Sequence, residues 1–181
     1  MDEDIGLIER YAAGDEGAAE ELVKKYQRRI YAFHFRMTND REEAKDLTQK
    51  TFVNVFRGVG GFRKDSSFKT WLYRIALNAG LSQAGRSRPE ESPVDETVAC
   101  SRAGALSSML EEERTGLLKR ALKTLPERQK MAVVLRVYDG LSCCETAEAM
   151  GCSEGAVKAH YHSAVKRLRE AMKEQGYEIY T

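Results

Sequence analysis

The sequence predicts an all-α protein built from two small helical domains joined by an acidic, flexible linker. Three observations predict this fold. Apolar residues recur at spacings of three and four along most of the chain, and only 3 prolines interrupt 181 residues. Alternating strand patterns are absent. Between residues 87 and 110, prolines, acids and serines replace the apolar periodicity. We therefore expect domains over residues 1–86 and 111–175.

Four helices are expected in the first domain. A short amphipathic segment ends near Gly14, and Asp15 can cap a second helix. Asn39 or Asp40 can cap a third helix, which the glycines at 58, 60 and 61 end. A fourth helix is expected from about Ser67 to Gly85. Its apolar residues are Phe68, Trp71, Leu72, Ile75 and Leu81.

The second domain is expected to contain a helix-turn-helix. One helix ends at Leu125, and Pro126 can start the next, which carries Met131, Val134, Leu135 and Val137. Ser142 and Glu145 form a capping-box pattern at the start of a short helix. Gly151 then provides a turn, and Ser153 can cap a long, basic last helix. Two helices joined by such a turn are typical of duplex-DNA binding.

The net charge of +1 conceals two basic blocks. Residues 63–88 contain six basic residues and one acidic residue, and residues 153–173 contain five and two. Between these blocks, residues 89–113 contain seven acidic residues and one arginine. Basic blocks attract polyanions, of which nucleic acid is the commonest, although a solvated helix face has the same composition.

Several classes of protein are not supported. The sequence contains no run of 18 apolar residues, so it does not predict a membrane-spanning segment. Its acidic N-terminus is unlike a signal peptide. The four cysteines have no disulfide or zinc spacing, which favours a reduced, cytoplasmic setting. We expect Cys143 and Cys152 to pack inward. No catalytic residues, metal site, cofactor or small-molecule substrate are expected.

The segment from Phe62 to Arg74 interleaves aromatic and basic side chains at the start of a helix. Aromatic rings can stack on unpaired bases while lysine and arginine hold phosphates, which suits opened DNA. Taken alone, the pattern favours a simpler alternative. In that alternative the aromatic side chains only fill the core: Phe62, Phe68, Trp71 and Tyr73.

Three segments resemble one family of proteins. The segment 62–78, FRKDSSFKTWLYRIALN, is similar to the promoter-melting segment of bacterial sigma factors of the extracytoplasmic-function (ECF) group. The segment 46–52, DLTQKTF, resembles the polymerase-binding helix of that group. Residues 125–129 and 139–142, with the helix-turn-helix that follows, resemble its C-terminal domain. The matches keep the family's order along almost the whole chain.

The resemblance implies a role for each matched position. The polymerase-binding residues would be Asp46, Leu47, Gln49 and Phe52. The −10 element would be opened and read by Phe62, Arg63, Lys64, Asp65, Ser66, Ser67, Phe68, Lys69, Trp71, Arg74 and Asn78. The −35 element would be bound by Arg136, Lys158, Ala159, His160, His162, Ser163, Lys166 and Arg167. The implied partners are core RNA polymerase, promoter DNA and an anti-sigma factor.

Two other hypotheses are distinguishable from this one. A stand-alone, dimeric helix-turn-helix regulator explains the C-terminal half but leaves the matches at 46–52 and 62–78 to chance. An enzyme has little support, because the sequence offers no phosphate-binding glycine loop and only 3 histidines. The first of these, His34, lies among aromatic residues, where a packed or surface position is expected.

Overall fold

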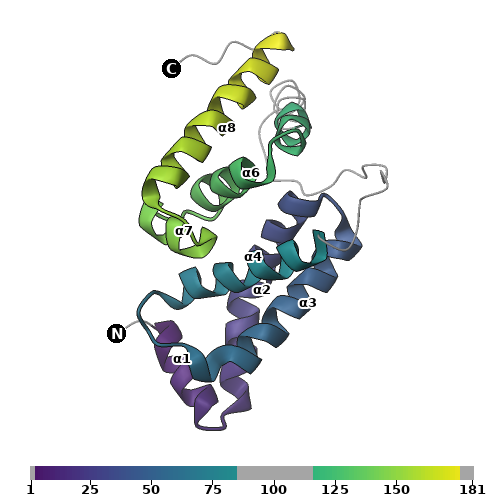
Figure 1. Ribbon diagram of the computed structural model, residues 1–181. Coiled ribbons are helices and arrows are strands. Elements are labelled where there is room, and N and C mark those ends of the chain that lie inside the picture. The colour runs from purple at the N-terminus through teal and green to yellow at the C-terminus, as the bar shows by residue number, and fades with distance from the viewer. Residues whose placement is uncertain (1–2, 85–115, 176–181) are drawn as a thin grey trace, which may run out of the picture.

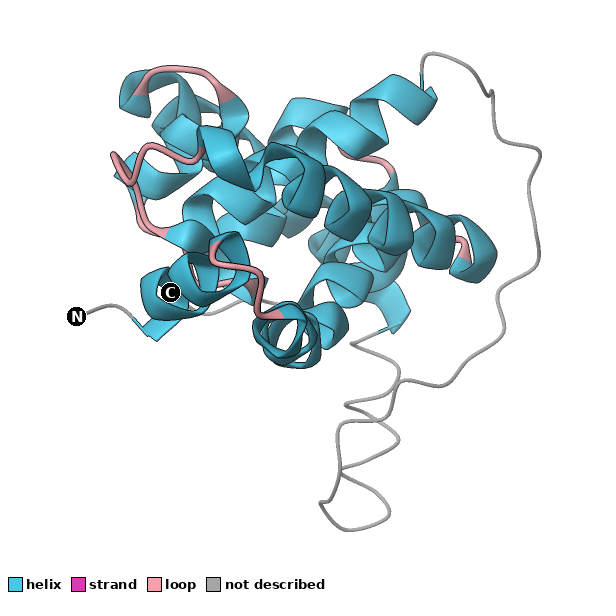
Figure 2. Ribbon diagram, turned by 90° about the horizontal axis from the view of Figure 1, so that it is seen from below, coloured by secondary structure: helices cyan, strands magenta, loops and turns pink. Residues whose placement is uncertain are grey.

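The computed structural model describes residues 3–84 and 116–175, and every regular element in these two ranges is a helix (Figures 1 and 2). This confirms the predicted all-α fold. The predicted linker at 87–110 lies outside the described residues, as does Gly85 at the expected end of the fourth helix.

Four α-helices form the N-terminal part: α1 (Glu3–Ala12), α2 (Glu16–Thr38), α3 (Arg41–Gly58) and α4 (Phe68–Ala84). A short 3₁₀ turn, η1 (Val59–Gly61), follows α3. The Asp15 carboxylate accepts a hydrogen bond from the Gly17 N–H at 3.0 Å and caps α2. Asp40 caps α3 by accepting from the Glu43 N–H at 2.8 Å, whereas Asn39 ends α2 in the left-handed conformation. Both sequence-predicted caps are therefore present.

The C-terminal part begins with a helix over residues 116–123, followed by α6 (Glu127–Val133), η2 (Val134–Tyr138), α7 (Cys143–Met150) and α8 (Glu154–Glu174). The capping box is confirmed. Ser142 Oγ accepts from the Glu145 N–H at 3.1 Å, and the Glu145 carboxylate accepts from the Ser142 N–H at 2.7 Å. Ser153 caps α8 at the Ala156 N–H. Helices α7 and α8 form the predicted helix-turn-helix.

Two residues of the predicted apolar faces are instead exposed. Val137 was expected to pack with Val134 and Leu135, but its exposed fraction is 58%. The reason is that η2 is a π-helix, whose wider turn changes the direction of the side chains after Leu135. Leu81, expected on the apolar stripe of α4, has an exposed fraction of 42%.

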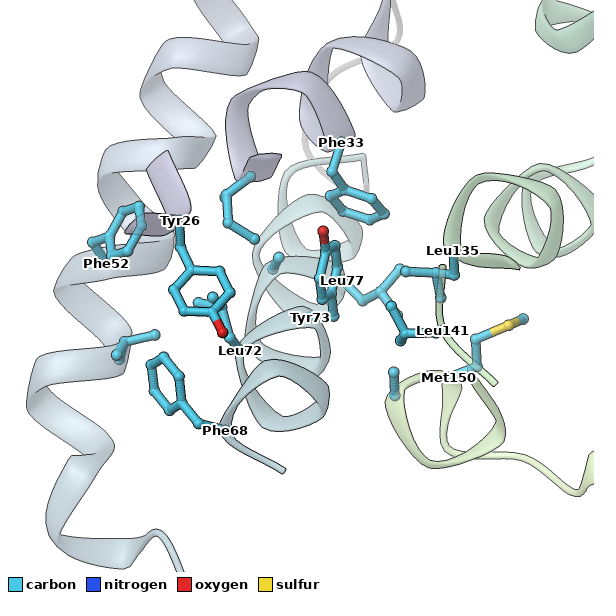
Figure 3. Close-up of a cluster of buried hydrophobic side chains, with 14 of the residues drawn as sticks. Tyr26, Phe33, Phe52, Phe68, Leu72, Tyr73, Leu77, Leu135, Leu141 and Met150 are labelled. Carbon is cyan, nitrogen blue, oxygen red and sulfur yellow. The ribbon is translucent and has the colours of Figure 1, made fainter. Parts of the chain in front are cut away.

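The hydrophobic core is shared between the two parts of the molecule. Close to the centre lie Phe33, Phe68 and Tyr73, all almost fully buried, and the same cluster continues into Leu135 and Leu141 (Figure 3). The C-terminal part has a smaller cluster of its own, formed by Leu122, Leu125, Val133 and Ala164. The two parts therefore pack on each other in this structure (Figure 1).

A polar pair is buried between α2 and α3. The Thr51 hydroxyl donates to the Leu47 carbonyl at 2.7 Å, so its oxygen is left to accept from His34 Nε2 at 2.9 Å. His34 is 1% exposed, which confirms the packed alternative for this residue. Burial lowers the pKa of its imidazole to about 4.

Candidate nucleic-acid interface

The α3 face predicted to bind polymerase consists of two exposed and two buried side chains. Asp46 and Gln49 are exposed. Leu47 and Phe52 belong to the core, and only 1% of Leu47 is exposed. A direct contact through Leu47 is therefore excluded in this structure, because its side chain already packs inside the N-terminal part. Leu47 and Phe52 instead fix the helix that presents Asp46 and Gln49.

The loop between η1 and α4 has two fixed ends and an exposed middle. At its start, the Phe62 ring packs against Phe68 and Trp71, with ring centroids 6.2 and 5.1 Å away. At its end, Ser67 Oγ accepts from the Thr70 N–H at 3.1 Å and caps the first turn of α4. The buried positions of Phe62, Phe68 and Tyr73 match the alternative in which these rings fill the core. Their packing leaves the polar residues of the loop on the surface: Arg63, Lys64, Asp65, Ser66 and Ser67.

Lys64, at the tip of this loop, has a left-handed backbone with φ 61°. For a residue with a side chain, this conformation costs about 1–2 kcal/mol relative to the right-handed region. The Lys64 ammonium pairs with the Glu9 carboxylate of α1 at 2.5 Å. This ion pair therefore connects the tip of the loop to helix α1. No sequence signal indicated either the strained backbone or this ion pair.

Helix α4 presents a surface that continues from the loop. Arg74 and Asn78 are exposed, and their spacing of four places them on one face. Trp71, one turn earlier, is half-buried against the loop and Gly58. Loop and helix together thus form a basic surface with an aromatic edge, which can bind a phosphate backbone and unpaired bases.

A second exposed basic surface lies on α8. Lys158, His162 and Lys166 recur every four residues and are exposed, as are Ala159 and Arg167. His160 and Ser163 are half-buried beside them. Arg136 of η2 lies over the ring of Tyr161 on α8, with its guanidinium carbon 5.8 Å from the ring centroid. All eight residues predicted to bind the −35 element therefore retain some exposure on α8 or next to it.

No metal-binding group is present in residues 3–84 and 116–175. Cys143 and Cys152 are half-buried against the core, as predicted, and Cys143 Sγ donates to the Glu154 carbonyl at 3.7 Å. Cys144 is exposed. Within the same ranges, no helix is both long and apolar enough to cross a bilayer.

Asp139, which precedes Gly140 at the turn before α7, connects the C-terminal part of the molecule to the N-terminal part. Its carbonyl accepts from Lys69 Nζ of α4 at 2.7 Å, and its carboxylate accepts from the Tyr73 hydroxyl at 2.8 Å. Burial raises the pKa of the Asp139 carboxyl. Sequence reasoning assigned Lys69 to DNA and did not detect its contact with the C-terminal part, since nothing local in the sequence indicates a pair 70 residues apart.

These features define a class of protein: a two-part helical protein in which a helix-turn-helix accompanies a second basic surface suited to opened DNA. Two family models match the chain, Sigma-70 region 2 over residues 22–88 and Sigma-70, region 4 over residues 115–168. The RNA polymerase sigma-H factor of Pseudomonas aeruginosa is 37% identical over 184 residues, covering 95% of this chain and 93% of that protein. The ECF RNA polymerase sigma-E factor of Escherichia coli is 38% identical over 178 residues, covering 92% and 90%.

Solved structures agree on the fold. The structure of CnrH in complex with the cytosolic domain of CnrY matches with a TM-score of 0.72 and 23% identity, covering 94% of this chain and 97% of that chain. The sigma factor RpoE in complex with the anti-sigma factor NepR from Bartonella quintana matches with a TM-score of 0.70 and 22% identity, covering 85% and 96%.

The chain belongs to the ECF group of the sigma-70 family. It is thus a transcription initiation factor, which binds core RNA polymerase and directs it to promoters. The stand-alone regulator is not favoured, because the family match extends over both parts of the chain.

Proposed function

We propose that this sigma factor docks on core RNA polymerase through the exposed face of α3, with Asp46 and Gln49 as the direct contacts. The family resemblance suggests the clamp coiled coil of the largest polymerase subunit as their target. Leu47 and Phe52 contribute by fixing α3 in the core. This division of roles rests on which of the four side chains are exposed.

The loop from Phe62 to Ser67 is proposed to hold a base flipped out of the −10 element, with Asn78 and Arg74 on α4 beside it. A flipped base exchanges lost stacking, a few kcal/mol, for contacts in a protein pocket. The single observation that carries this proposal is the anchored loop: Phe62 and Ser67 fix its ends while the side chains of residues 63–65 stay exposed. The proposed role of Phe68, which is fully buried, is to support the loop. Lys69 and Trp71 lie at the edge of this surface.

The exposed face of α8 is proposed to enter the major groove of the −35 element. Lys158, His162 and Lys166 lie on one face of the helix, and Ser142 and Ser153 cap the two helices of the motif. Arg136, Ala159, His160, Ser163 and Arg167 border this face.

The proposed domains are region 2 over residues 1–86 and region 4 over residues 111–175, with a linker over residues 87–110. We propose that the chain acts in the cytoplasm with polymerase, and that it has no cofactor, small-molecule substrate or chemistry of its own. An anti-sigma partner is proposed as well, supported by the fold shared with CnrH and RpoE, which were solved with CnrY and NepR.

Single substitutions on the two surfaces separate these roles. Asp46→Ala should weaken binding to core polymerase, measured by fluorescence anisotropy, without changing promoter choice. Arg63→Ala should leave polymerase binding intact but reduce strand opening, measured by permanganate reactivity of unpaired thymines. Glu20→Gln, on an exposed part of α2, is the control for both. Unchanged polymerase affinity for Asp46→Ala, or normal opening with Arg63→Ala, would contradict the corresponding assignment.

A further inference from the structure

Helix α1 has no part in the functions assigned so far. It precedes the residues matched by the Sigma-70 region 2 model, which begin at 22, and it carries none of the predicted polymerase or DNA contacts. It is nevertheless firmly packed. Leu7 and Ile8 are buried in the core, and the Tyr11 ring centroid lies 5.0 Å from that of Phe56 on α3. Helix α1 also lies beside η1, from which the proposed −10 loop begins (Figure 1).

Polar contacts fix α1 on α2 as well. The Arg10 guanidinium pairs with the carboxylates of Asp15 at 2.7 Å and Glu21 at 3.2 Å. The Asp4 carboxylate, which is buried, accepts a hydrogen bond from the Tyr26 hydroxyl at 2.5 Å. Because α1 is held against both α2 and α3, a side chain on its exposed face is presented from a fixed position.

The tip of the −10 loop depends on such a side chain. Among the residues that the structure describes, two besides glycine have a positive φ, Asn39 and Lys64. Asn39 ends α2, and its N–H donates to the Phe35 carbonyl at 2.8 Å. Lys64 ends no helix. The contact that the described residues provide for it is the ion pair between its ammonium and the carboxylate of Glu9, on the exposed face of α1.

The ion pair and the strained backbone are of similar strength. The side chains of Lys64 and Glu9 are 45% and 56% exposed, and an ion pair with this exposure shifts an equilibrium by up to about fivefold. A left-handed backbone at a residue with a Cβ atom costs a comparable amount. The ion pair therefore offsets the strain that would otherwise favour another conformation of the tip. The pair between Lys24 and Glu20, both in regular α2, offsets no such strain.

We propose that Glu9 is a positioning residue for −10 recognition: its carboxylate fixes the Lys64 ammonium and so holds the loop tip in the conformation that receives the flipped base. This inference rests on the proposed −10 function of the loop. The backbone at Lys64 sets the directions of its exposed neighbours, Arg63 and Asp65. Pairing with Lys64 also compensates the charge of Glu9, which would otherwise repel nearby phosphates. Lys64 then serves −10 recognition through the shape of the loop, and α1 becomes part of the site.

The first test measures the loop in the free, full-length chain. Trypsin cleaves the bond after Arg63 only when the loop opens locally, so the cleavage rate, followed by mass spectrometry, reports the open population. Glu9→Ala should raise this rate about threefold. In a Lys64→Met background, where no ammonium is present, Glu9→Ala should leave the rate unchanged. Glu20→Ala is the matched control, because it removes the exposed pair with Lys24 and should not affect the loop.

The second test measures strand opening by the holoenzyme. Glu9→Ala should slow the appearance of permanganate-reactive thymines about threefold while leaving affinity for core polymerase unchanged. Glu9→Gln should lose less, because its amide oxygen still accepts a hydrogen bond from Lys64. In the Lys64→Met background, Glu9→Ala should again have no effect on opening.

Three results would overturn the proposal. One is a Glu9→Ala holoenzyme that opens the promoter as fast as wild type or faster, since a faster rate would mean that the carboxylate only repels DNA. Another is a Glu9→Ala chain cleaved after Arg63 no faster than wild type. The third is an effect of Glu9→Ala that persists in the Lys64→Met background. If Arg63→Ala is defective in opening, these results refute only the role of Glu9; normal opening with Arg63→Ala would instead refute the function proposed for the loop.

Discussion

Acidification is expected to destabilise the N-terminal domain through one buried side chain, His34. Burial lowers the pKa of its imidazole to about 4, against 6.5 for an ordinary histidine. Between these two values the unfolded chain binds the proton and the folded chain does not. Stability therefore rises with pH across this window and is lost as the pH falls from 6.5 toward 4.

The magnitude follows from the difference between the two pKa values. A pKa difference of about 2.5 corresponds to a loss of about 3.4 kcal/mol in the free energy of unfolding. The whole loss is reached only below pH 4. Between pH 8 and pH 5, the expected loss from His34 is about 2 kcal/mol. Solvent screening reduces this value little, since only 1% of His34 is exposed.

The assay is urea unfolding of wild type and His34→Gln at pH 8 and pH 5. Trp71, the only tryptophan in the chain, reports unfolding of the N-terminal domain by fluorescence. Carboxylates titrate in both proteins, so their contributions cancel in the comparison. Wild type should lose about 2 kcal/mol more than His34→Gln over this interval. His162→Gln, which removes an exposed histidine from α8, should behave like wild type.

Parallel stability curves for wild type and His34→Gln would refute this reasoning. Such a result would mean that the imidazole is protonated as easily in the folded chain as in the unfolded chain. The hydrogen bond from His34 Nε2 to Thr51 would be compatible with that result, because a protonated imidazole keeps the Nε2 proton.

Three further predictions concern the DNA-binding elements. Ser142→Ala should cost about 1 kcal/mol of stability in thermal unfolding, because it removes the N-cap of α7; an unchanged midpoint would exclude a role for the capping box. Lys64→Gly should be about 1 kcal/mol more stable than Lys64→Ala in urea unfolding, since only glycine adopts φ 61° without strain; equal stabilities would argue against the left-handed backbone. Lys158→Ala should reduce the salt dependence of holoenzyme binding to promoter DNA by about one phosphate contact, whereas Lys24→Ala on α2 should not.

Local sequence signals predicted the helices and their ends well. Asp15, Asp40, Ser142 and Ser153 are caps in the structure, because capping depends on a few neighbouring residues. The π-helix η2 was not predicted, and it is the reason for the wrong placement of Val137. An inserted π turn has no composition of its own and follows from packing around it.

The assignment of the site residues stays a prediction, and the structure adds the exposure of each side chain. The resemblance could not distinguish Asp46 on the surface from Leu47 in the core. Nor could it detect Asp139 against Lys69 and Tyr73, because that contact joins distant parts of the chain. Such long-range pairs depend on how the helices pack, which periodicity along one helix does not specify.

Transcription in vitro tests the central claim most directly. The purified chain is added to bacterial core RNA polymerase with a supercoiled library of promoter fragments, and the transcripts are sequenced. A sigma factor is expected to produce transcripts that start only in its presence and share a two-part upstream element. Failure to bind core polymerase stably, together with no chain-dependent transcript from any fragment, would contradict the account.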